Sequence, residues 1–171
     1  MLTLSAAEAA SQIISITVDY SQSLHKMIRT SGFNIPVGIK SFTQKRFPVV
    51  GKGIVEFEAK LFHFNRDLTS EEACELIVSS EPDNPWELPG TEHVMAFGAS
   101  FPQGKLEFSI LCLLKNTDKN DPDTLGLWYE FEDTKFLVIL GTKTRIGSKW
   151  AANYRFLASR KKRTPSTTSP N

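Results

Sequence analysis

Residues 53–72 read GIVEFEAKLFHFNRDLTSEE, and this stretch decides the fold class because its periodicity changes from that of a strand to that of a helix. Alternate residues from Val55 to Leu61 are apolar and the residues between them are charged, which predicts a strand with one buried face. Thr69 and Glu72 then have the spacing of a capping box, which predicts that a helix begins here. A strand that leads directly into a helix indicates a domain of mixed composition.

The same two periodicities recur on both sides of this stretch. Alternation predicts further strands near residues 14–20, 125–132 and 150–159, and apolar runs predict strands near 106–114 and 136–140. Helical spacing predicts short helices near 5–12, 21–32 (with Ser21 as N-cap) and 91–101. The run at 136–140 is continuously apolar, which is typical of a central strand. The last three predicted strands follow one another closely, which favours antiparallel pairing. We therefore expect an α+β fold, with a mainly antiparallel sheet of about six strands and about four short helices packed on one face.

The length and composition indicate one folded domain. The chain has 171 residues, of which 40% are hydrophobic and 23% charged, so it can bury a sizeable core. We expect a globular domain over residues 1–159 and a basic, Ser/Thr/Pro-rich disordered tail over 160–171. No apolar run is long enough to span a membrane. The first residues lack the basic start of a signal peptide, so we expect a cytoplasmic protein with Cys74 and Cys112 as reduced, buried thiols.

Positive charge is concentrated towards the C-terminus. The stretch from Lys143 to Arg163 holds eight basic residues and no acidic ones, whereas the rest of the chain holds twelve basic and nineteen acidic residues. Aromatic residues lie among these cations, and a positive surface with stacking faces is a property of proteins that bind single-stranded nucleic acid. The nucleic-acid candidates are Lys149, Arg155, Arg160, Lys161, Lys162 and Arg163. The alternative interpretations are an aromatic core stripe followed by a solvated tail, and contact of this region with an anionic membrane surface.

The densest polar cluster lies at the end of the strand predicted at 53–64. His63, Asn65, Arg66 and Asp67 precede the helix that begins at Thr69, so together they could transfer protons or bind an anion. The structural alternative is a histidine bonded to a backbone group, an aspartate that stabilises the helix N-terminus and a surface arginine. If His63 is sealed in the core with a backbone partner, the enzymatic hypothesis fails.

The remaining candidate motifs are incomplete. Ser23 and Lys26 match S-x-x-K, but the companion elements of that enzyme class are absent. The three histidines are far apart in the sequence and have no ligand spacing, so we expect no metal site and no cofactor.

Several short patches between residues 16 and 161 form a recognisable set. They are Thr17–Ser21, Leu24–Ile28, Gly32-Phe33, Phe47-Pro48, Val55–Phe64, His63–Asp67 with Thr69–Glu72, Ala96–Gly98, Pro102 and Arg155–Lys161. Together these patches resemble a recurrent group of small bacterial hypothetical proteins. The segment 104–114 departs from the glycine-containing pattern of that group. The resemblance implies a bacterial or mobile-element origin and an intracellular setting. No activity is established for the group, so the resemblance assigns no catalytic residue.

These observations favour a non-enzymatic binding or interaction module with a protein partner, because no candidate catalytic set is complete. A nucleic-acid-associated protein that uses the basic C-terminal region is the first alternative. An enzyme or ligand-binding protein centred on His63, Arg66 and Asp67 is the second.

Overall fold

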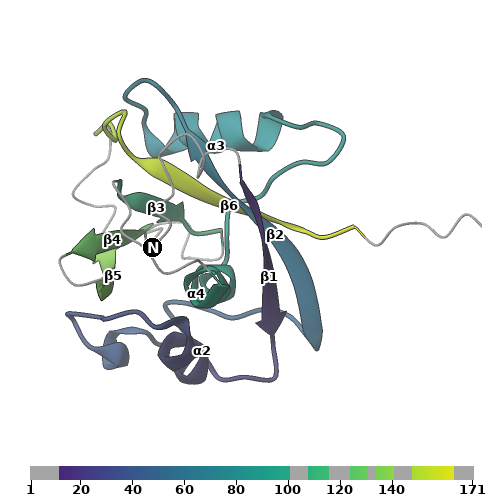
Figure 1. Cartoon of the computed structure of the whole chain (residues 1–171), viewed down its shortest axis with the longest axis vertical. Coiled ribbons are helices and arrows are strands. Elements are labelled where there is room, and N and C mark those ends of the chain that lie inside the picture. The colour runs from purple at the N-terminus through teal and green to yellow at the C-terminus, as the bar shows by residue number, and fades with distance from the viewer. Residues whose placement is uncertain (1–11, 101–107, 116–123, 131–133, 141–147, 164–171) are drawn as a thin grey trace, which may run out of the picture.

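The computed structural model describes residues 12–100, 108–115, 124–130, 134–140 and 148–163, and Figure 1 shows their arrangement. In chain order the elements are β1 (Ile13–Asp19), α2 (Leu24–Ser31), the 3₁₀ helix η1 (Ile39–Ser41), β2 (Ile54–His63), α3 (Ser70–Ser79), α4 (Thr91–Ser100), β3 (Ile110–Leu113), β4 (Thr124–Glu130), β5 (Thr134–Leu140) and β6 (Arg155–Lys161). The fold is α+β, as expected. The helix expected at 5–12 and the tail expected beyond residue 163 lie outside the described residues, apart from Gln12.

The six strands form one mixed sheet in the order β1-β2-β6-β3-β4-β5. The expectation of a mainly antiparallel sheet is wrong, because β6 enters between β2 and β3 and runs parallel to β3. The last three strands therefore do not form a simple meander. Only β4 and β5 pair with each other, while β6 returns across the molecule to β2. The sequence between β5 and β6 did not reveal this crossing, because strand order depends on contacts distant in the chain.

Helices cover both faces of the sheet rather than one. One core lies between the sheet and the pair α2 and α4, and includes Met27, Val94 and Phe97. A second core lies under α3 and contains Ala73, Ile77 and Trp86. Figure 1 shows α3 on one side of β2 and β6, with α2 and α4 on the other. The central strand β6 is apolar on both faces because it contributes to both cores.

Two helices begin where side chains satisfy free backbone N–H groups. Thr69 and Glu72 form the expected capping box of α3, with reciprocal bonds of 2.8 and 3.2 Å. The cap of α2 is Ser23, not Ser21, because the Ser21 hydroxyl donates instead to Asp19 Oδ1 at 2.7 Å. Gly32 then ends α2 with a φ of 73°, a conformation that glycine adopts without a steric cost.

The apolar strand β5 lies at the edge of the sheet and not at its centre. Its free side is covered by the segment after α2, where Asn34 N donates to Lys135 O at 2.7 Å and Leu137 N donates to Asn34 O at 2.9 Å. The Lys135 ammonium also donates to Gly98 O near the end of α4 at 2.7 Å. This cover explains how an edge strand can be almost wholly apolar.

The C-terminal strand begins and ends later than its sequence pattern indicates. Trp150 forms an isolated bridge with Leu68, and β6 starts only at Arg155. It continues through Arg160 and Lys161, which pair with Glu58 and Phe57 of β2. These two residues, which the sequence analysis assigned to the tail, belong to the sheet.

Candidate functional site

The cluster expected at His63 holds two segments of the chain together. His63 Nε2 donates to Ala152 O at 2.9 Å, and Asp67 Oδ1 accepts from Ala152 N at 3.0 Å. Leu68 and Trp150 exchange both of their backbone hydrogen bonds beside this contact. His63 has the backbone partner expected of a structural histidine. Its side chain is half-buried, so it is not sealed in the core. Asn65 and Arg66 are exposed.

The C-terminal cations differ in their surroundings. Arg155 is only 5% exposed, and burial lowers the pKa of its guanidinium. It lies 4.9 Å from the centre of the Phe108 ring and donates to the carbonyls of Asn153 and Tyr154. Lys149 and Lys161 are exposed. Arg155 is therefore part of the buried core, and its charge is not accessible to a partner.

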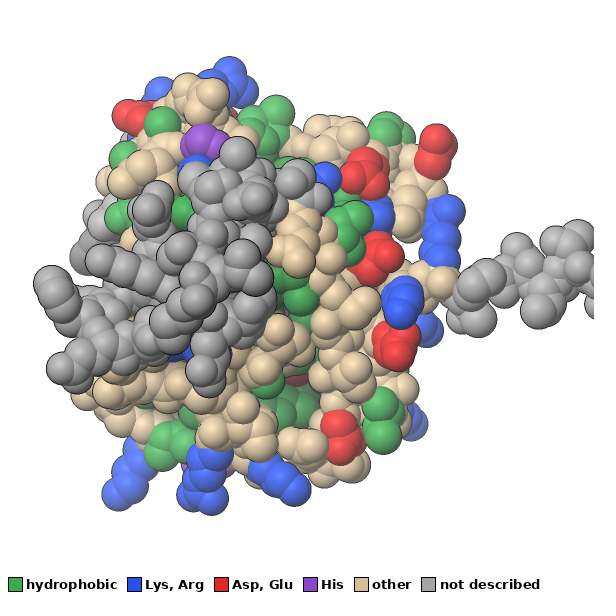
Figure 2. All heavy atoms as spheres, viewed as in Figure 1, with side chains coloured by type: hydrophobic (Ala, Val, Ile, Leu, Met, Phe, Trp, Pro, Cys, Tyr) green, Lys and Arg blue, Asp and Glu red, His purple; other side chains and the backbone are tan. Residues whose placement is uncertain are grey.

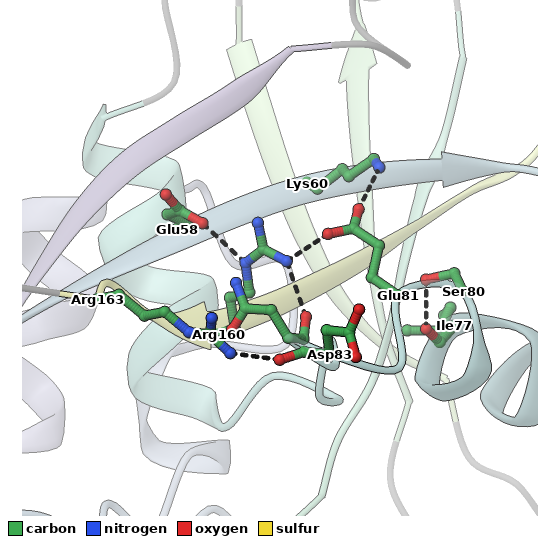
Figure 3. Close-up of polar contacts among 9 residues, drawn as sticks. Glu58, Lys60, Ile77, Ser80, Glu81, Asp83, Arg160 and Arg163 are labelled. Atoms are coloured by element: carbon green, nitrogen blue, oxygen red, sulfur yellow. Dashed lines mark hydrogen bonds and ion pairs between the residues drawn. The ribbon is translucent and has the colours of Figure 1, made fainter. Parts of the chain in front are cut away.

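Arg160 is the centre of an ion-pair network on the α3 side of the sheet (Figure 3). Its Nε donates to Glu58 Oε2 at 2.8 Å, and its Nη1 donates to Glu81 Oε2 at 2.5 Å and to Asn84 O at 2.8 Å. The guanidinium also lies 4.0 Å from the centre of the Trp86 ring. Arg160 thus already has the carboxylate and aromatic partners that a nucleic acid would have to replace.

The neighbouring charges extend this network. Lys60 contacts Glu81 at 3.2 Å, Lys162 contacts Glu56 at 3.0 Å, and Arg163 donates to the backbone carbonyl of Asp83. The Trp86 indole and the Arg160 guanidinium lower the pKa of Glu81 to about 2. Four of the six cations proposed for nucleic-acid binding thus have partners within the chain, namely Arg155, Arg160, Lys162 and Arg163.

A groove that the sequence analysis did not identify lies beside α2, on the other side of the sheet from α3. It has a volume of about 560 Å³ and is formed by the turn after β1, the start of α2, η1 and the segment that follows η1. A concavity of this size is in the range of small-ligand sites. Its lining residues are Tyr20, Gln22, Ser23, Leu24, His25, Lys40, Phe42, Thr43, Gln44 and Val49.

Local contacts hold the walls of the groove in place. His25 Nε2 donates to Phe42 O at 3.1 Å, which ties α2 to the segment after η1. Gln44 Nε2 donates to Val49 O at 3.1 Å. Below the wall, Phe42 and Phe47 are stacked with their ring centres 4.6 Å apart, and both are fully buried. The polar groups along the groove therefore rest on an apolar base.

The groove belongs to a segment without any acidic residue. From Tyr20 to Val55 the chain contains six Lys and Arg residues and no Asp or Glu, whereas the rest contains fourteen basic and nineteen acidic residues. The six are exposed: Lys26, Arg29, Lys40, Lys45, Arg46 and Lys52. Figure 2 shows blue side chains gathered at the end of the molecule where α2 lies in Figure 1. We call these six residues the basic face.

Five of the six residues of the basic face differ from the C-terminal cations in their partners. Within the described ranges, Lys26, Arg29, Lys40, Lys45 and Lys52 form no ion pair with a carboxylate. Arg46 lies 5.3 Å from the centre of the Phe47 ring. The sequence did contain the relevant feature, an acid-free stretch from residue 20 to 55, but its cations are spread thinly and do not form a run.

A buried polar pair lies behind the groove. Glu92 and His93, at the start of α4, are 1% and 2% exposed. The Tyr20 side chain, which lines the groove, hydrogen-bonds to Glu92, and Glu92 also lines a second cavity of about 90 Å³. Burial and the Glu92 charge raise the pKa of Tyr20 to about 12, and burial raises the pKa of Glu92. Burial, followed by the charge of Lys115, lowers the pKa of His93 to about 3.

Gly51 packs against the Tyr20 ring, which gives a prediction. A Cβ at this position would lie 2.3 Å from Tyr20 Cε1, and the side-chain hydrogen bond to Glu92 restrains the ring. Gly51→Ala should therefore lower the free energy of unfolding by about 1–3 kcal/mol, because the ring must move. Urea unfolding measures the loss. Val50→Ala, at an exposed neighbouring position, should change it by less than about 0.5 kcal/mol, and an equally small effect of Gly51→Ala would contradict the packing described.

The other candidate motifs have structural roles. The Ser23 hydroxyl caps α2 by accepting from Lys26 N at 3.3 Å, so the S-x-x-K match is a helix cap. Cys74 and Cys112 are free thiols whose pKa values burial raises, which disfavours the reactive thiolate.

Within the described ranges, no group of three His, Cys, Asp or Glu side chains is placed to hold a metal ion. No helix among the described residues has the length and apolarity to cross a membrane.

Comparisons of the chain with protein-family models, with curated proteins and with solved structures gave no match.

Proposed function

We propose that this protein is a non-enzymatic binding module that holds an anionic partner in the groove beside α2. The observation that carries this proposal is the position of the groove within the basic face. A concave site of about 560 Å³ lies in a segment of six exposed cations and no carboxylate, although the chain as a whole carries a net charge of only +1. Such a local excess of one sign attracts ligands of the opposite sign and raises their association rate.

The groove supplies the donors that an anion needs. The Lys40 ammonium, the hydroxyls of Ser23 and Thr43 and the Gln44 amide are all on its lining. Hydrogen bonds from charged donors to phosphate or carboxylate oxygens are about twice as strong as bonds between neutral groups. None of the described residues that line the groove is a carboxylate that would repel an anion.

The two alternatives from the sequence receive less support. Nucleic-acid binding at the C-terminus would have to break the pairs of Arg160 with Glu58 and Glu81. Catalysis at His63 would have to use a ring nitrogen and a carboxylate that already hold Ala152.

Charge removal tests the proposal. Lys40→Gln combined with Lys45→Gln should weaken the binding of inorganic pyrophosphate, measured by isothermal titration calorimetry, by roughly tenfold or more. The charge-assisted bond from Lys40, which lines the groove, is worth about 1.5 kcal/mol or more, and Lys45 adds to the positive charge of the same segment. The matched control, Lys149→Gln with Lys161→Gln, removes two exposed lysines outside the basic face and should leave the affinity within about twofold. A larger loss in the control pair than in the groove pair would contradict the proposal and favour the C-terminal region.

A further inference from the structure

We propose that the anionic partner is the surface of a membrane rich in anionic phospholipids, with a lipid phosphate in the groove and two neighbouring loops in the headgroup layer. This inference rests on the proposed function, since it names the partner of the same site. It makes the protein peripheral, attached by charge and by shallow insertion and not by a spanning helix.

The first observation is the amount and spread of positive charge. The basic face supplies six cations, from α2, from η1 and from the segment between η1 and β2. A small metabolite needs only the one or two cations that reach it, so the others suit an extended array of negative charge. Clusters of four to eight Lys and Arg residues are typical of surfaces that recognise anionic lipids.

The second observation distinguishes a membrane from a nucleic acid. Three of the most exposed large hydrophobic residues of the described chain lie among these cations, namely Val37 at 58%, Val50 at 64% and Ile54 at 72% exposure. Val37 lies in the turn before η1 and Lys40, while Val50 and Ile54 lie on either side of Lys52. Phosphate contacts do not need exposed aliphatic side chains, whereas insertion into a headgroup layer does.

The third observation is that the groove connects these loops. Its lining includes Lys40 from η1 and Val49 from the loop that carries Val50, and Gly51 of the same loop packs on the Tyr20 ring. Figure 2 shows hydrophobic side chains between the blue ones at this end of the molecule. A headgroup phosphate near Lys40 would therefore have the exposed valines beside it.

Vesicle flotation with the full chain tests the inference. The protein should float with vesicles of phosphatidylcholine mixed with phosphatidylglycerol, and should remain unbound with phosphatidylcholine alone. Raising the salt should release it. Lys40→Gln with Lys45→Gln should weaken the partition by at least roughly tenfold, at about fivefold for each charge. Val37→Ser with Val50→Ser keeps every charge and should weaken it by roughly threefold or more.

The control is Val78→Ser, which removes an exposed valine of α3 outside the basic face and should leave partition unchanged. Equal binding to both kinds of vesicle would overturn the inference. So would the valine pair binding as well as the unsubstituted chain, or a single-stranded oligonucleotide bound more tightly than the vesicles with no effect of the valines. Pyrophosphate binding retained without vesicle binding would refute the membrane and leave the proposed function standing. Loss of both would refute both.

Discussion

Arg160→Ala is expected to lower the free energy of unfolding by about 2–3 kcal/mol, the largest effect that we predict for a residue that is only partly buried. The substitution removes three charge-assisted hydrogen bonds and the contact with the Trp86 ring. It also leaves Glu58 without its cation and Glu81 with Lys60 alone, in a partly desolvated site where breaking a pair costs more than its net worth. Urea unfolding near neutral pH measures the difference.

Two variants show whether this loss belongs to the network or to charge alone. Lys162→Ala breaks the exposed pair with Glu56 and should cost less than about 0.5 kcal/mol. Arg160→Lys keeps the charge but cannot reach both carboxylates with a planar group, so it should fall between the unsubstituted chain and Arg160→Ala. If Arg160→Ala were as mild as Lys162→Ala, the network would be an ordinary surface contact.

The second large effect is a loss of stability in acid that depends on His93. The buried ring accepts a hydrogen bond from Gly90 N at 2.9 Å through Nδ1, so it must be neutral there. Its pKa falls from 6.5 to about 3 on folding, which means that the unfolded chain binds the proton more readily. The contribution of His93 is therefore fully present above pH 6.5 and is lost as the pH falls towards 3, at a cost on the order of 5 kcal/mol.

His93→Asn provides the test, because the amide oxygen can still accept from Gly90 N but does not titrate. Urea unfolding as a function of pH should show a smaller slope below pH 6.5 in this variant than in the unsubstituted chain. Glu92 acts in the opposite direction, since its raised pKa costs stability as the pH rises above 4.5. The comparison must therefore be the slope of each variant and not its absolute stability. Parallel slopes would show that His93 is not the group responsible.

Local features of the fold followed from the sequence because they depend on neighbours in the chain. Alternation predicted β1 and β2, and the spacing of Thr69 and Glu72 predicted the start of α3. Helix caps and strand faces are fixed within a few residues, so a local pattern contains them.

Features that depend on distant contacts did not follow. The parallel pairing of β6 with β3 and the edge position of β5 are set by segments far apart in sequence. The same is true of the C-terminal charges. Glu58 lies opposite Arg160 only because β2 and β6 pair in that register. The sequence does not show this register, and it therefore favoured a tail of free cations.

The candidate site was missed for a related reason. The residues that line the groove come from separate elements, such as His25 from α2 and Lys40 from η1. A search for runs of charge favours Arg160 to Arg163 and overlooks them. The absence of acidic residues from 20 to 55 was the more informative pattern, because the net positive charge of this segment does not depend on how the segment folds.

The most direct test of the central claim is a titration of the isotopically labelled chain with inorganic pyrophosphate, followed by the amide shifts in NMR spectra. The account predicts that the largest shifts fall on the groove, at residues 20–25 and 40–49, and that they saturate. Saturating shifts confined to 149–163, or to the contact of His63 and Asp67 with Ala152, would contradict it, as would a spectrum that does not change.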